Sequence, residues 1–584
     1  MKKSLLLIPL SSLALLALIG CSSISASGNT NDGGIHGDVV IDDTGDEPNV
    51  DNTSSFELTS SDGTYTSSGS VYTINSAGTF TASGVLEDGQ IIINAPDTAE
   101  VVLELNGVSI SCDSDSPIKA LEADKVEISA KSGTSNLVED ARSEKSSTAT
   151  DDGTYGEGAI NADCDLKLKG SGTLVVRGNY NNGVHTTKDL DIQKETLYVT
   201  AVNNAIKGKD SITMISGAVT AISKKGNGLK TENTDVSSSG KQRGTITISG
   251  GTLICDSTFD GLDAAYDLVI NEDNEESLDT KITVKTGKNA TYSSNYSSAT
   301  SAKGLKAANQ ISIAAGTVGV KATDDAIHAN YGDALSNGST GVGKINISGG
   351  TIGVASGDDG LHADNTLTIS GGNINITGAT EGLESNHIVI TGGSTCVYGT
   401  DDGVNVSKKI NETPTIKISG GFLDVAVSNG DTDGIDSNGN FEMTGGFVVT
   451  RGSPNNASNM STGLDCDGTA KIAGGTLIAF NGLEKTPSIG SGVLYAYYGT
   501  TSQGGPGGGG HGGGWPVAAS SITFNSGTYT LTGNGFSKTF ENSYQYSKFL
   551  IYSNELVQGN TYTLSCDGSQ VLNWTQSSSS VAIS

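Results

Sequence analysis

Short stretches in which apolar and polar residues alternate recur along most of the chain. Two clear examples are residues 245–248, which read Thr-Ile-Thr-Ile, and residues 344–347, which read Lys-Ile-Asn-Ile. A period of two places one set of side chains inward and the other outward, so these stretches are predicted to be β-strands. The repetitive part of the chain shows no helical periodicity with caps at its ends, and we expect no helices there.

The strands belong to a unit that recurs from about residue 157 to residue 480. In its clearest copy, Asp358-Asp359-Gly360-Leu361 precedes an alternating strand, a Gly-Gly pair and a second alternating strand. Neighbouring copies are often about 22 residues apart, and inserted loops lengthen some of the intervals. The small residue of the unit falls at Ala159, Gly183, Ala205, Gly228, Gly261, Gly304, Ala326, Gly360, Gly382, Gly403, Gly434 and Gly463.

A repeat of strands without crossover helices predicts an all-β solenoid, because each unit buries its aliphatic side chains only against its neighbours. We expect a right-handed single-stranded parallel β-helix of about 22 residues per coil, with a small β cap at its C-terminal end. A β-propeller is the rival architecture, but its blades need about twice this period. The nonapeptide calcium-binding roll is excluded because its glycine-aspartate pattern is missing.

The first residues read as a targeting signal. Two lysines precede an apolar run from Leu5 to Ile19, which is short for a membrane span, and Leu18-Ile19-Gly20-Cys21 has the pattern of a bacterial lipobox. We therefore expect lipidation at Cys21, although an ordinary signal peptide with a chance cysteine is the alternative.

The chain is predicted to divide into six sections. These are a lipoprotein signal peptide (1–20), a flexible tether (21–54), an N-terminal β segment with the first coils (55–156), repeats (157–484), a Gly-rich loop (485–516) and a C-terminal β cap (517–584).

Composition and charge narrow the range of partners. The chain has 80 glycines and only 5% aromatic residues, and its net charge is −30. Such a charge repels nucleic acid, so no nucleic-acid partner is expected. Acidic polysaccharides remain possible partners because bound cations can invert the local sign. Beyond Cys21 the cysteines are widely spaced, and we interpret them as small buried apolar residues rather than as a disulfide framework: Cys112, Cys164, Cys255, Cys396, Cys466 and Cys566.

Equivalent positions of successive coils should stack into columns. The position before the small residue is an amide in the early coils and a carboxylate in the later ones. Carboxylates about 4.8 Å apart repel each other by roughly 0.9 kcal/mol in water, so the later coils need protons, solvent or a shared cation. Calcium suits such a stack, whereas the alternative is that each Asp-Gly pair is only a solvated turn. The candidate calcium ligands are Asp324, Asp325, Asp358, Asp359, Glu381, Asp401, Asp402 and Asp433.

A second column lies two residues after the small residue, and its first half is mostly basic. A basic stripe beside calcium could hold the carboxylates of uronic acids, whereas the alternative is an exposed strand with solvated charges. The candidate carbohydrate-binding residues are Lys230, Lys306, His328 and His362.

The chain resembles the clostridial-type cell-surface carbohydrate-binding β-helix proteins, whose fold is similar to that of pectate lyases. Besides the coils, the resemblance lies in the opening segments 84–93, 103–110 and 124–128 and in the closing segments 546–553 and 559–563. It implies binding of cellulose-like or acidic plant-type glycans, with calcium held by aspartates at coil corners. The six aspartates of the three Asp-Asp pairs fall on that motif, and Glu381 and Asp433 match it in part. Asn182, Asn204, Asn227 and Lys303 depart from it.

Three functions are compatible with these patterns. The first is a non-catalytic polysaccharide binder. The second is a polysaccharide lyase acting on uronic-acid polymers, and the third is a surface adhesin or spacer. A lyase needs a base beside its cation. Arg177 and Arg451 have no identifiable partner in the sequence, and no lysine or histidine is visibly poised as a base. We expect a monomeric non-enzyme on the extracellular face of a bacterial cell, bound to the membrane only through its lipid.

Aromatic side chains, which often stack on sugars, are scarce. Tyr495, Tyr497, Tyr498 and Trp515 flank the Gly-rich loop and are candidates for a stacking platform, whereas the alternative is a bare linker. Trp574 is expected to pack inside the cap.

Overall fold

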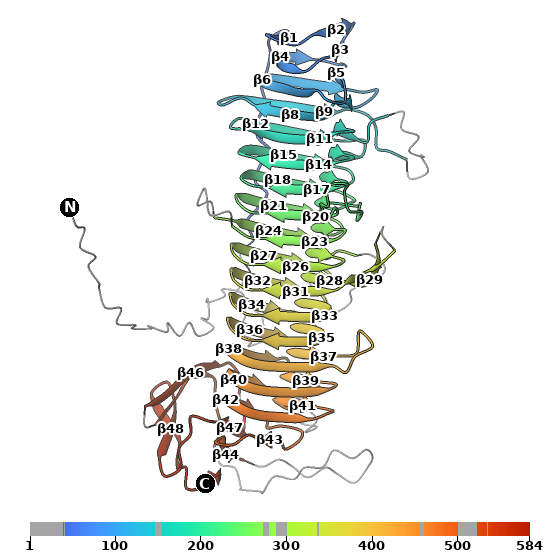
Figure 1. The fold of residues 1–584 in the computed structure, drawn as a ribbon. Helices are drawn as coiled ribbons and strands as arrows, with labels where there is room; N and C mark the ends of the chain where they lie inside the picture. The colour runs from blue at the N-terminus through green and yellow to red at the C-terminus, as the bar shows by residue number, and fades with distance from the viewer. Residues whose placement is uncertain are drawn as a thin grey trace, which may run out of the picture.

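The computed structural model describes residues 39, 41–146, 155–272, 279–287, 301–335, 338–454, 461–499, 522–533 and 535–583. Within these ranges every regular element is a β-strand, so the prediction of an all-β fold is confirmed. The described part of the chain accordingly has no helix long and apolar enough to cross a bilayer. The strands stack along one axis into an elongated body, and the C-terminal strands lie beside its last coils (Figure 1).

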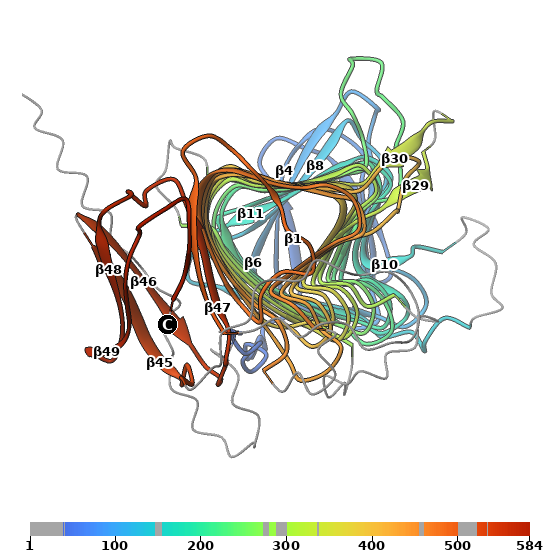
Figure 2. The same ribbon diagram turned by 90° about the horizontal axis from the view of Figure 1, so that it is seen from below.

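Most strands pair in parallel with the equivalent strand of the next coil, and three ladders result. Viewed along the axis, the coils superimpose around a common interior (Figure 2). The first ladder contains β3 (Val71–Ile74), β5 (Gln90–Asn94), β7 (Ile118–Glu122), β10 (Gly158–Ala162), β13 (Asn182–Thr186), β16 (Ile206–Gly208), β19 (Leu229–Lys230), β22 (Leu262–Ala264), β25 (Leu305–Ala307), β28 (Ile327–Ala329), β33 (Leu361–Ile369), β35 (Leu383–Ile390), β37 (Val404–Val406), β39 (Ile435–Ser437) and β41 (Leu464–Cys466).

The other two ladders share several long strands that turn a corner. The second ladder contains β6 (Glu100–Cys112), β8 (Lys125–Ala130), β11 (Asp165–Gly170), β14 (Asp189–Gln193), β17 (Ser211–Met214), β20 (Thr245–Ile248), β23 (Asp267–Ile270), β26 (Gln310–Ile313), β31 (Lys344–Ile347), the later parts of β33 and β35, β38 (Thr415–Val427), β40 (Asn440–Arg451), β42 (Ala470–Phe480) and β43 (Ser488–Ile489). The third contains the end of β6, β9 (Ser135–Asp140), β12 (Thr173–Gly178), β15 (Glu195–Ala201), β18 (Gly217–Ser223), β21 (Thr252–Ser257), β24 (Lys281–Thr286), β27 (Thr317–Ala322), β32 (Thr351–Ser356), β34 (Asn373–Gly378), β36 (Ser394–Gly399) and the ends of β38, β40 and β42.

The interior is a column of aliphatic side chains, one set per coil. In β20, Ile246 and Ile248 are fully buried, whereas the threonines between them are only half-buried. Ile246 stacks on Ile212 of the preceding coil and on Leu268 of the following one. The alternating pattern therefore sets which side of each strand faces the core. Cys112, Cys164, Cys255 and Cys466 are buried free cysteines, in agreement with their expected role as small apolar residues. Two cysteines differ from this expectation, because Cys566 is partly exposed and Cys396 is disulfide-bonded.

Glycine is required at two kinds of position in each coil. A Cβ atom on Gly382 would lie only 2.0 Å from Cγ1 of Val397, because the third ladder packs against the small residue of the unit. The second glycine of the Gly-Gly pair has a positive φ, as in Gly372 (86°) and Gly393 (79°), a conformation that side chains disfavour. These two constraints explain why the repeat keeps small residues at the same places.

Both ends of the stack are closed by antiparallel strands. At the N-terminal end, β1 (Glu57–Ser60) pairs with β4 (Gly78–Leu86), and β2 (Tyr65–Ser68) pairs with β3. A hairpin of β29 (Tyr331–Ala334) and β30 (Thr340–Val342) projects from the side. The C-terminal elements are β44 (Leu494–Tyr498), β45 (Gly527–Gly533), β46 (Phe536–Asn542), β47 (Phe549–Ser553), β48 (Thr561–Cys566), β49 (Ser569–Thr575) and β50 (Ser580–Ala582).

The C-terminal strands attach to the stack through β47, which pairs antiparallel with both β42 and β44. Arg451, for which the sequence identified no partner, is fully buried at this junction and contacts Asp424 and the backbone oxygen of Glu541. The sequence could not reveal the contact with Glu541 because that residue lies far away along the chain. Strands β43 (Ser488–Ile489) and β44 lie inside the segment 485–516 that was predicted to be a Gly-rich loop, so the first part of that segment contains regular structure.

The segment before the first strand differs from the expected flexible tether. Asp42 forms an ion pair with Lys281, Glu47 with Arg177, and Asn52 donates a hydrogen bond to Ser109. Residues 41–54 therefore lie along the side of the coils, held by charges that a composition argument does not locate. Cys21 and the signal peptide lie outside the described residues, and so does Trp515.

Candidate functional site

The column two residues after the small residue forms as the repeat predicted. The register pairs Lys306 with His328, His328 with His362, and His362 with Glu384, along β25, β28, β33 and β35. The same register continues through Asn405 to Asp436 and Asp465. One face of the first ladder therefore presents a continuous line of polar side chains.

The column before the small residue is a ladder that links each side chain to the backbone of the next coil. Oδ1 of Asn182 accepts hydrogen bonds from Nδ2 (2.9 Å) and from the backbone N–H (3.2 Å) of Asn204. In the acidic half, Oδ1 of Asp325 accepts the N–H of Asp359 at 3.0 Å, and Oδ1 of Asp402 accepts that of Asp433 at 2.7 Å. Asn and Asp serve equally as acceptors here, but only the Asp positions bring charge.

Lysine neutralises the upper part of the acidic run. Nζ of Lys303 lies 3.0 Å from Oδ1 of Asp324 and 2.6 Å from Oδ2 of Asp325, and all three side chains are nearly buried. Burial opposes the charge of Asp325, but His328, His362 and Lys303 prevail and hold the pKa of Asp325 well below its usual range. A resident ammonium group therefore already occupies the position beside these two carboxylates.

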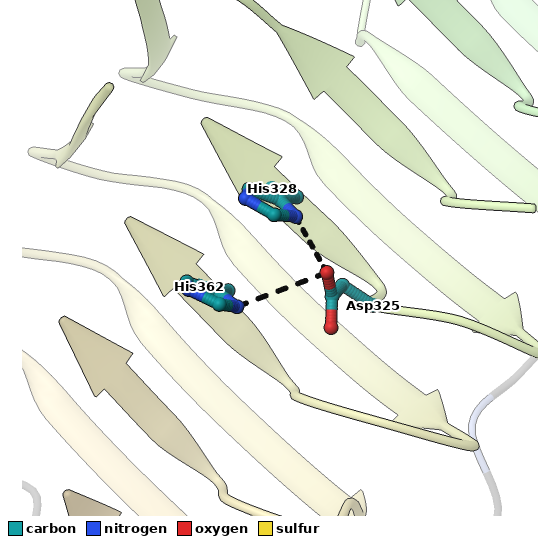
Figure 3. A group of neighbouring side chains, drawn as sticks. All are labelled: Asp325, His328 and His362. Atoms are coloured by element: carbon teal, nitrogen blue, oxygen red, sulfur yellow. Dashed lines mark hydrogen bonds and ion pairs between the residues drawn. The ribbon is translucent and has the colours of Figure 1, made fainter. Parts of the chain in front are cut away.

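Two histidine rings stack next to Asp325. The rings of His328 and His362 are parallel within 6°, with centroids 4.2 Å apart, and both present Nδ1 to Oδ2 of Asp325 (Figure 3). That oxygen lies 2.5 Å from Nδ1 of His328 and 3.8 Å from Nδ1 of His362. Strands β28 and β33 place the rings on consecutive coils, so the stack is a direct product of the register.

Further carboxylates surround His362. Its Nδ1 lies 2.9 Å from Oδ2 of Asp359 and 3.2 Å from Oε2 of Glu384. On the opposite edge of the ring, Nε2 lies 3.1 Å from Oδ1 of Asp364. Burial opposes a positive charge on His362, but the nearby carboxylates of Asp325, Asp359 and Asp364 raise the pKa of this imidazole well above its usual value. The other oxygen of Glu384 contacts Lys409 at 2.6 Å.

An all-oxygen group lies at the coil corner beside the histidines. Asp358, Asp359 and Glu381 each offer a carboxylate oxygen within 4.8 Å of the others, and Asp324, Asp325 and Asp358 form a second such group. Burial raises the pKa of Asp358, Asp359 and Glu381, so these carboxylates resist ionisation when no cation is bound. Carboxylate oxygens in flexible geometry are the ligands that calcium prefers. The donor set therefore fits a calcium ion.

Among the described residues, no lysine, arginine or histidine is paired with the lower part of the acidic run, which consists of Asp401, Asp402 and Asp433. Burial, together with neighbouring carboxylates, raises the pKa of Asp402 to about 8 and that of Asp433 to about 7. The same causes raise the pKa of Asp436 and Asp465 to about 6. Within the described ranges, however, none of the three-ligand groups includes Asp401, Asp402 or Asp433. Eight candidate ligands thus divide into five that converge and three that are spread out.

The basic residues of the polar column are engaged in ion pairs. Nζ of Lys230 lies 2.7 Å from Asp263, and Nζ of Lys306 lies 3.3 Å from Asp260 and 3.9 Å from Asp263. The four predicted carbohydrate-binding residues therefore fall into two pairs. His328 and His362 join the acidic cluster, whereas Lys230 and Lys306 both contact Asp263, which lies between them in the same column, and Lys306 also contacts Asp260 of the neighbouring column.

The aromatic residues at the C-terminal end do not form an exposed platform. Tyr498 is buried, Tyr495 stacks on Tyr552 at 5.0 Å, and Tyr497 packs partly buried against the core. Trp574 packs inside the cap, next to Tyr562, as expected. Among the described tyrosines of this region, Tyr498 is thus unsuited to stack on a sugar.

Several participants in the site were not predicted. Glu384 was part of the aligned column but was not assigned a role, and Asp364 lies two residues after His362 on the same face of β33. The period-two rule could have identified both. Lys409 could not be placed in the same way, because it reaches Glu384 from an inserted loop. Lys303 precedes Asp325 in the same column, but the direction of its long side chain was not predictable.

Comparison with known proteins agrees with this architecture. A family model described as "Carbohydrate-binding domain-containing protein" matches residues 68–360 and 332–485, which together cover most of the chain. The chain therefore belongs to this family of carbohydrate-binding domain-containing proteins.

The chain is similar to two known proteins. A carbohydrate-binding domain-containing protein of Acetivibrio thermocellus is 31% identical over 199 residues, which are 34% of this chain and 65% of the relative. The chain thus spans somewhat less than two-thirds of that relative. A solved structure of a polysaccharide lyase-like protein from C. thermocellum, a gadolinium derivative, is 31% identical, with a TM-score of 0.34 over 39% of this chain and 86% of that one.

Proposed function

We propose that this protein is a calcium-binding polysaccharide-binding protein that does not cleave its ligand. Membership of the carbohydrate-binding family supports the ligand class. The observation that carries the calcium part is the convergence of Asp358, Asp359 and Glu381, whose carboxylates lie together at a coil corner with raised pKa values. A bound calcium ion would stabilise these charges and could also coordinate an acidic sugar.

The proposed ligand is an extended glycan, either cellulose-like or of the acidic pectin type. A continuous polar column along the first ladder supports an extended ligand, because successive coils repeat at the spacing of β-strands, about 4.8 Å. We further propose that the stacked ladders form a right-handed parallel β-helix and that lipidation at Cys21 anchors it to the extracellular face of the membrane. The parallel pairing of successive coils and the lipobox pattern support these two points.

We propose that the protein does not cleave its ligand, because the candidate catalytic bases near the carboxylate cluster favour their protonated forms. A lyase requires a neutral or otherwise available base next to its cation. Here Lys303 and Lys409 form ion pairs with the carboxylates of the cluster, and carboxylates surround His362, so each of these groups favours its protonated form. Polysaccharide cleavage, detected as unsaturated-uronide absorbance, would contradict this part of the proposal.

The test is calorimetric titration of residues 22–584 with polygalacturonate and with soluble cello-oligosaccharides. The measurement is made with calcium and after chelation, and segment 41–54 is retained because it packs on the coils. Binding of polygalacturonate that disappears on chelation supports the acidic-glycan form of the proposal, and calcium-independent binding of cello-oligosaccharide supports the cellulose-like form. No heat with either glycan would contradict glycan binding.

Paired variants assign the calcium effect to its residues. Asp358→Asn with Glu381→Gln should abolish the calcium dependence. Asp191→Asn, a half-buried outward position on β14, is the matched control and should leave it unchanged.

A further inference from the structure

The histidine stack has the chemistry of a different metal. Calcium takes oxygen ligands, whereas imidazole nitrogens select borderline metals such as zinc, nickel or cobalt. Asp325, His328 and His362 each offer one ligand atom within 4.8 Å of the others, and Oε2 of Glu384 lies 3.2 Å from Nδ1 of His362. Two nitrogens and two carboxylate oxygens therefore gather on three consecutive coils.

Three of the four ring nitrogens lack a hydrogen bond. Nδ1 of His328 contacts Oδ2 of Asp325, but Nε2 of His328 and both nitrogens of His362 are buried without a partner at hydrogen-bond geometry, although carboxylates lie around them. His328 is only 8% exposed. Buried polar atoms normally have partners, and an unpartnered one in a native site calls for an ion, water or chemical role.

The opposite edges of the two rings show why a metal suits this arrangement. Oδ1 of Asp364 lies 3.1 Å from Nε2 of His362 and 3.6 Å from Nε2 of His328, so one carboxylate faces both rings. Histidines that bind a metal usually direct the other ring N–H to a carboxylate, which fixes the tautomer. With Nε2–H directed to Asp364, both Nδ1 lone pairs point toward the side of Asp325.

The stacking brings the two Nδ1 atoms to one shared edge, because the ring centroids lie 4.2 Å apart and the rings are parallel within 6°. A single divalent cation at this edge provides the positive charge that the carboxylates require. Zinc sites are tetrahedral with zinc–nitrogen bonds of about 2.0–2.1 Å, so the two rings must rotate substantially out of the parallel stack to direct both Nδ1 lone pairs at one ion.

We propose that Nδ1 of His328, Nδ1 of His362, Asp325 and Glu384 form a site for one zinc-class divalent transition-metal ion, oriented by Asp364. The site adjoins the calcium group of Asp358, Asp359 and Glu381, because Oδ2 of Asp359 lies 2.9 Å from Nδ1 of His362, but it differs from that group in its two nitrogen ligands. Four protein ligands leave no open position, which is typical of a structural site. The ion joins β28, β33 and β35 across three coils, and Lys303 moves away from Asp325 when it binds.

The test is calorimetric titration of the metal-stripped full chain with Zn²⁺ in excess Ca²⁺, which fills the oxygen-only sites. We expect one Zn²⁺ per chain, with affinity at least tenfold lower in His328→Gln and in His362→Gln. Asp364→Asn should lower the affinity about 10–100-fold, as for other carboxylates that orient metal-bound histidines. Co²⁺ bound to the wild-type chain should give visible absorption bands that disappear in His362→Gln.

The matched control is His185→Gln. His185 occupies the same column on β13, but its Nδ1 lies 2.8 Å from the amide oxygen of Asn161, so this variant should bind Zn²⁺ as the wild type does.

Equal Zn²⁺ affinity in the wild type, His328→Gln and His362→Gln would overturn the proposal, and so would the absence of Zn²⁺ binding. Folding of each variant is verified by thermal unfolding, and the conservative Asp364→Asn variant tests the proposal if a histidine variant unfolds. Calcium-dependent glycan binding should persist in Asp364→Asn, because Asp364 belongs neither to the polar column nor to the calcium group, so failure here is distinguishable from failure of the proposed function.

Discussion

The same Asp-Asp-small motif occurs in two electrostatic settings along this protein. In the upper region, Asp324-Asp325 lie against Lys303 and the stacked histidines, and the pKa of Asp325 is well below its usual range. In the lower region, Asp401-Asp402 face other carboxylates, and burial with these charges raises the pKa of Asp402 to about 8. The local sequence is almost identical, so the difference comes from the neighbouring coils.

This comparison explains why a repeated motif does not imply a repeated site. Asp325 and Asp402 each accept a backbone N–H from the next coil, and this structural role is common to both regions. Whether a carboxylate also holds a cation depends on the side chains that the neighbouring coils bring to it. The hydrogen-bonded ladder is therefore common to both regions, whereas cation binding depends on the individual coil.

The largest expected effect comes from removing the resident cation of the upper region. Lys303→Met leaves Asp324 and Asp325 buried without their ammonium partner, and loss of one partner of a buried ion pair costs on the order of 3–5 kcal/mol. Chemical unfolding in the presence of a chelator should show a loss of this size in the free energy of unfolding, and added calcium should restore part of it. Lys225→Met, which removes an exposed lysine paired with Glu144, is the control and should cost less than about 1 kcal/mol. Equal costs for the two variants would contradict the assigned role of Lys303.

The lower region predicts a dependence of stability on pH. The usual aspartate pKa is about 3.9 in an unfolded chain. The folded values of about 8 for Asp402 and about 7 for Asp433 are raised, so their contribution to stability is full below the unfolded pKa and is lost as the pH rises through the folded values. In the presence of a chelator, the free energy of unfolding of the wild type should therefore be lower at pH 8.5 than at pH 5.

Asp402→Asn isolates this contribution. The amide can still accept the N–H of Asp433 but carries no charge. One unit of pKa corresponds to about 1.4 kcal/mol, so we expect the variant to be more stable than the wild type at pH 8.5 by at least that amount and nearly equal to it at pH 4. An unchanged pH profile in thermal or chemical unfolding would show that Asp402 is not the group responsible.

A smaller effect is expected where the ladder is amide. Asn204→Asp removes the Nδ2 donor to Asn182 and introduces a buried charge, which should cost about 1–3 kcal/mol at neutral pH. Asn346→Asp, on the outward side of β31, is the matched control and should change stability by less than about 0.5 kcal/mol. If both variants unfold at the same denaturant concentration, the amide ladder contributes nothing specific.

The smallest effect concerns the two lysines first considered for carbohydrate binding. Lys230 and Lys306 already contact Asp263 and Asp260, so their charges are not available to a uronate. Lys230→Gln and Lys306→Gln should each change the Kd for polygalacturonate less than about threefold, measured by calorimetry. A loss of affinity of tenfold or more in either variant would show that the basic column belongs to the glycan-binding surface.

Much of this organisation could be predicted from residue patterns. The alignment that placed Lys306, His328, His362 and Glu384 in one column is the observed register, because the side-chain period of a strand and the small residue of the unit fix it. The amide ladder was also predictable, since stacked asparagines can bond along a column.

The side-chain partners were not predictable in the same way. Lys303 was recognised only as a departure from the acidic motif, and its contact with Asp325 depends on how a long side chain turns. Arg451 lacked any visible partner because Asn542 lies in the distant cap. Patterns thus determine which residues share a face, whereas rotamers and chain closure determine which charges meet.

The central claim is that one calcium ion binds where Asp358, Asp359 and Glu381 converge. Its most direct test is a calcium titration of the metal-stripped protein by calorimetry, comparing the wild type with Asp358→Asn/Glu381→Gln and with Asp191→Asn. We predict that the wild type and Asp191→Asn bind calcium alike and that the double variant loses this binding event. Equal calcium binding by all three proteins would contradict the claim.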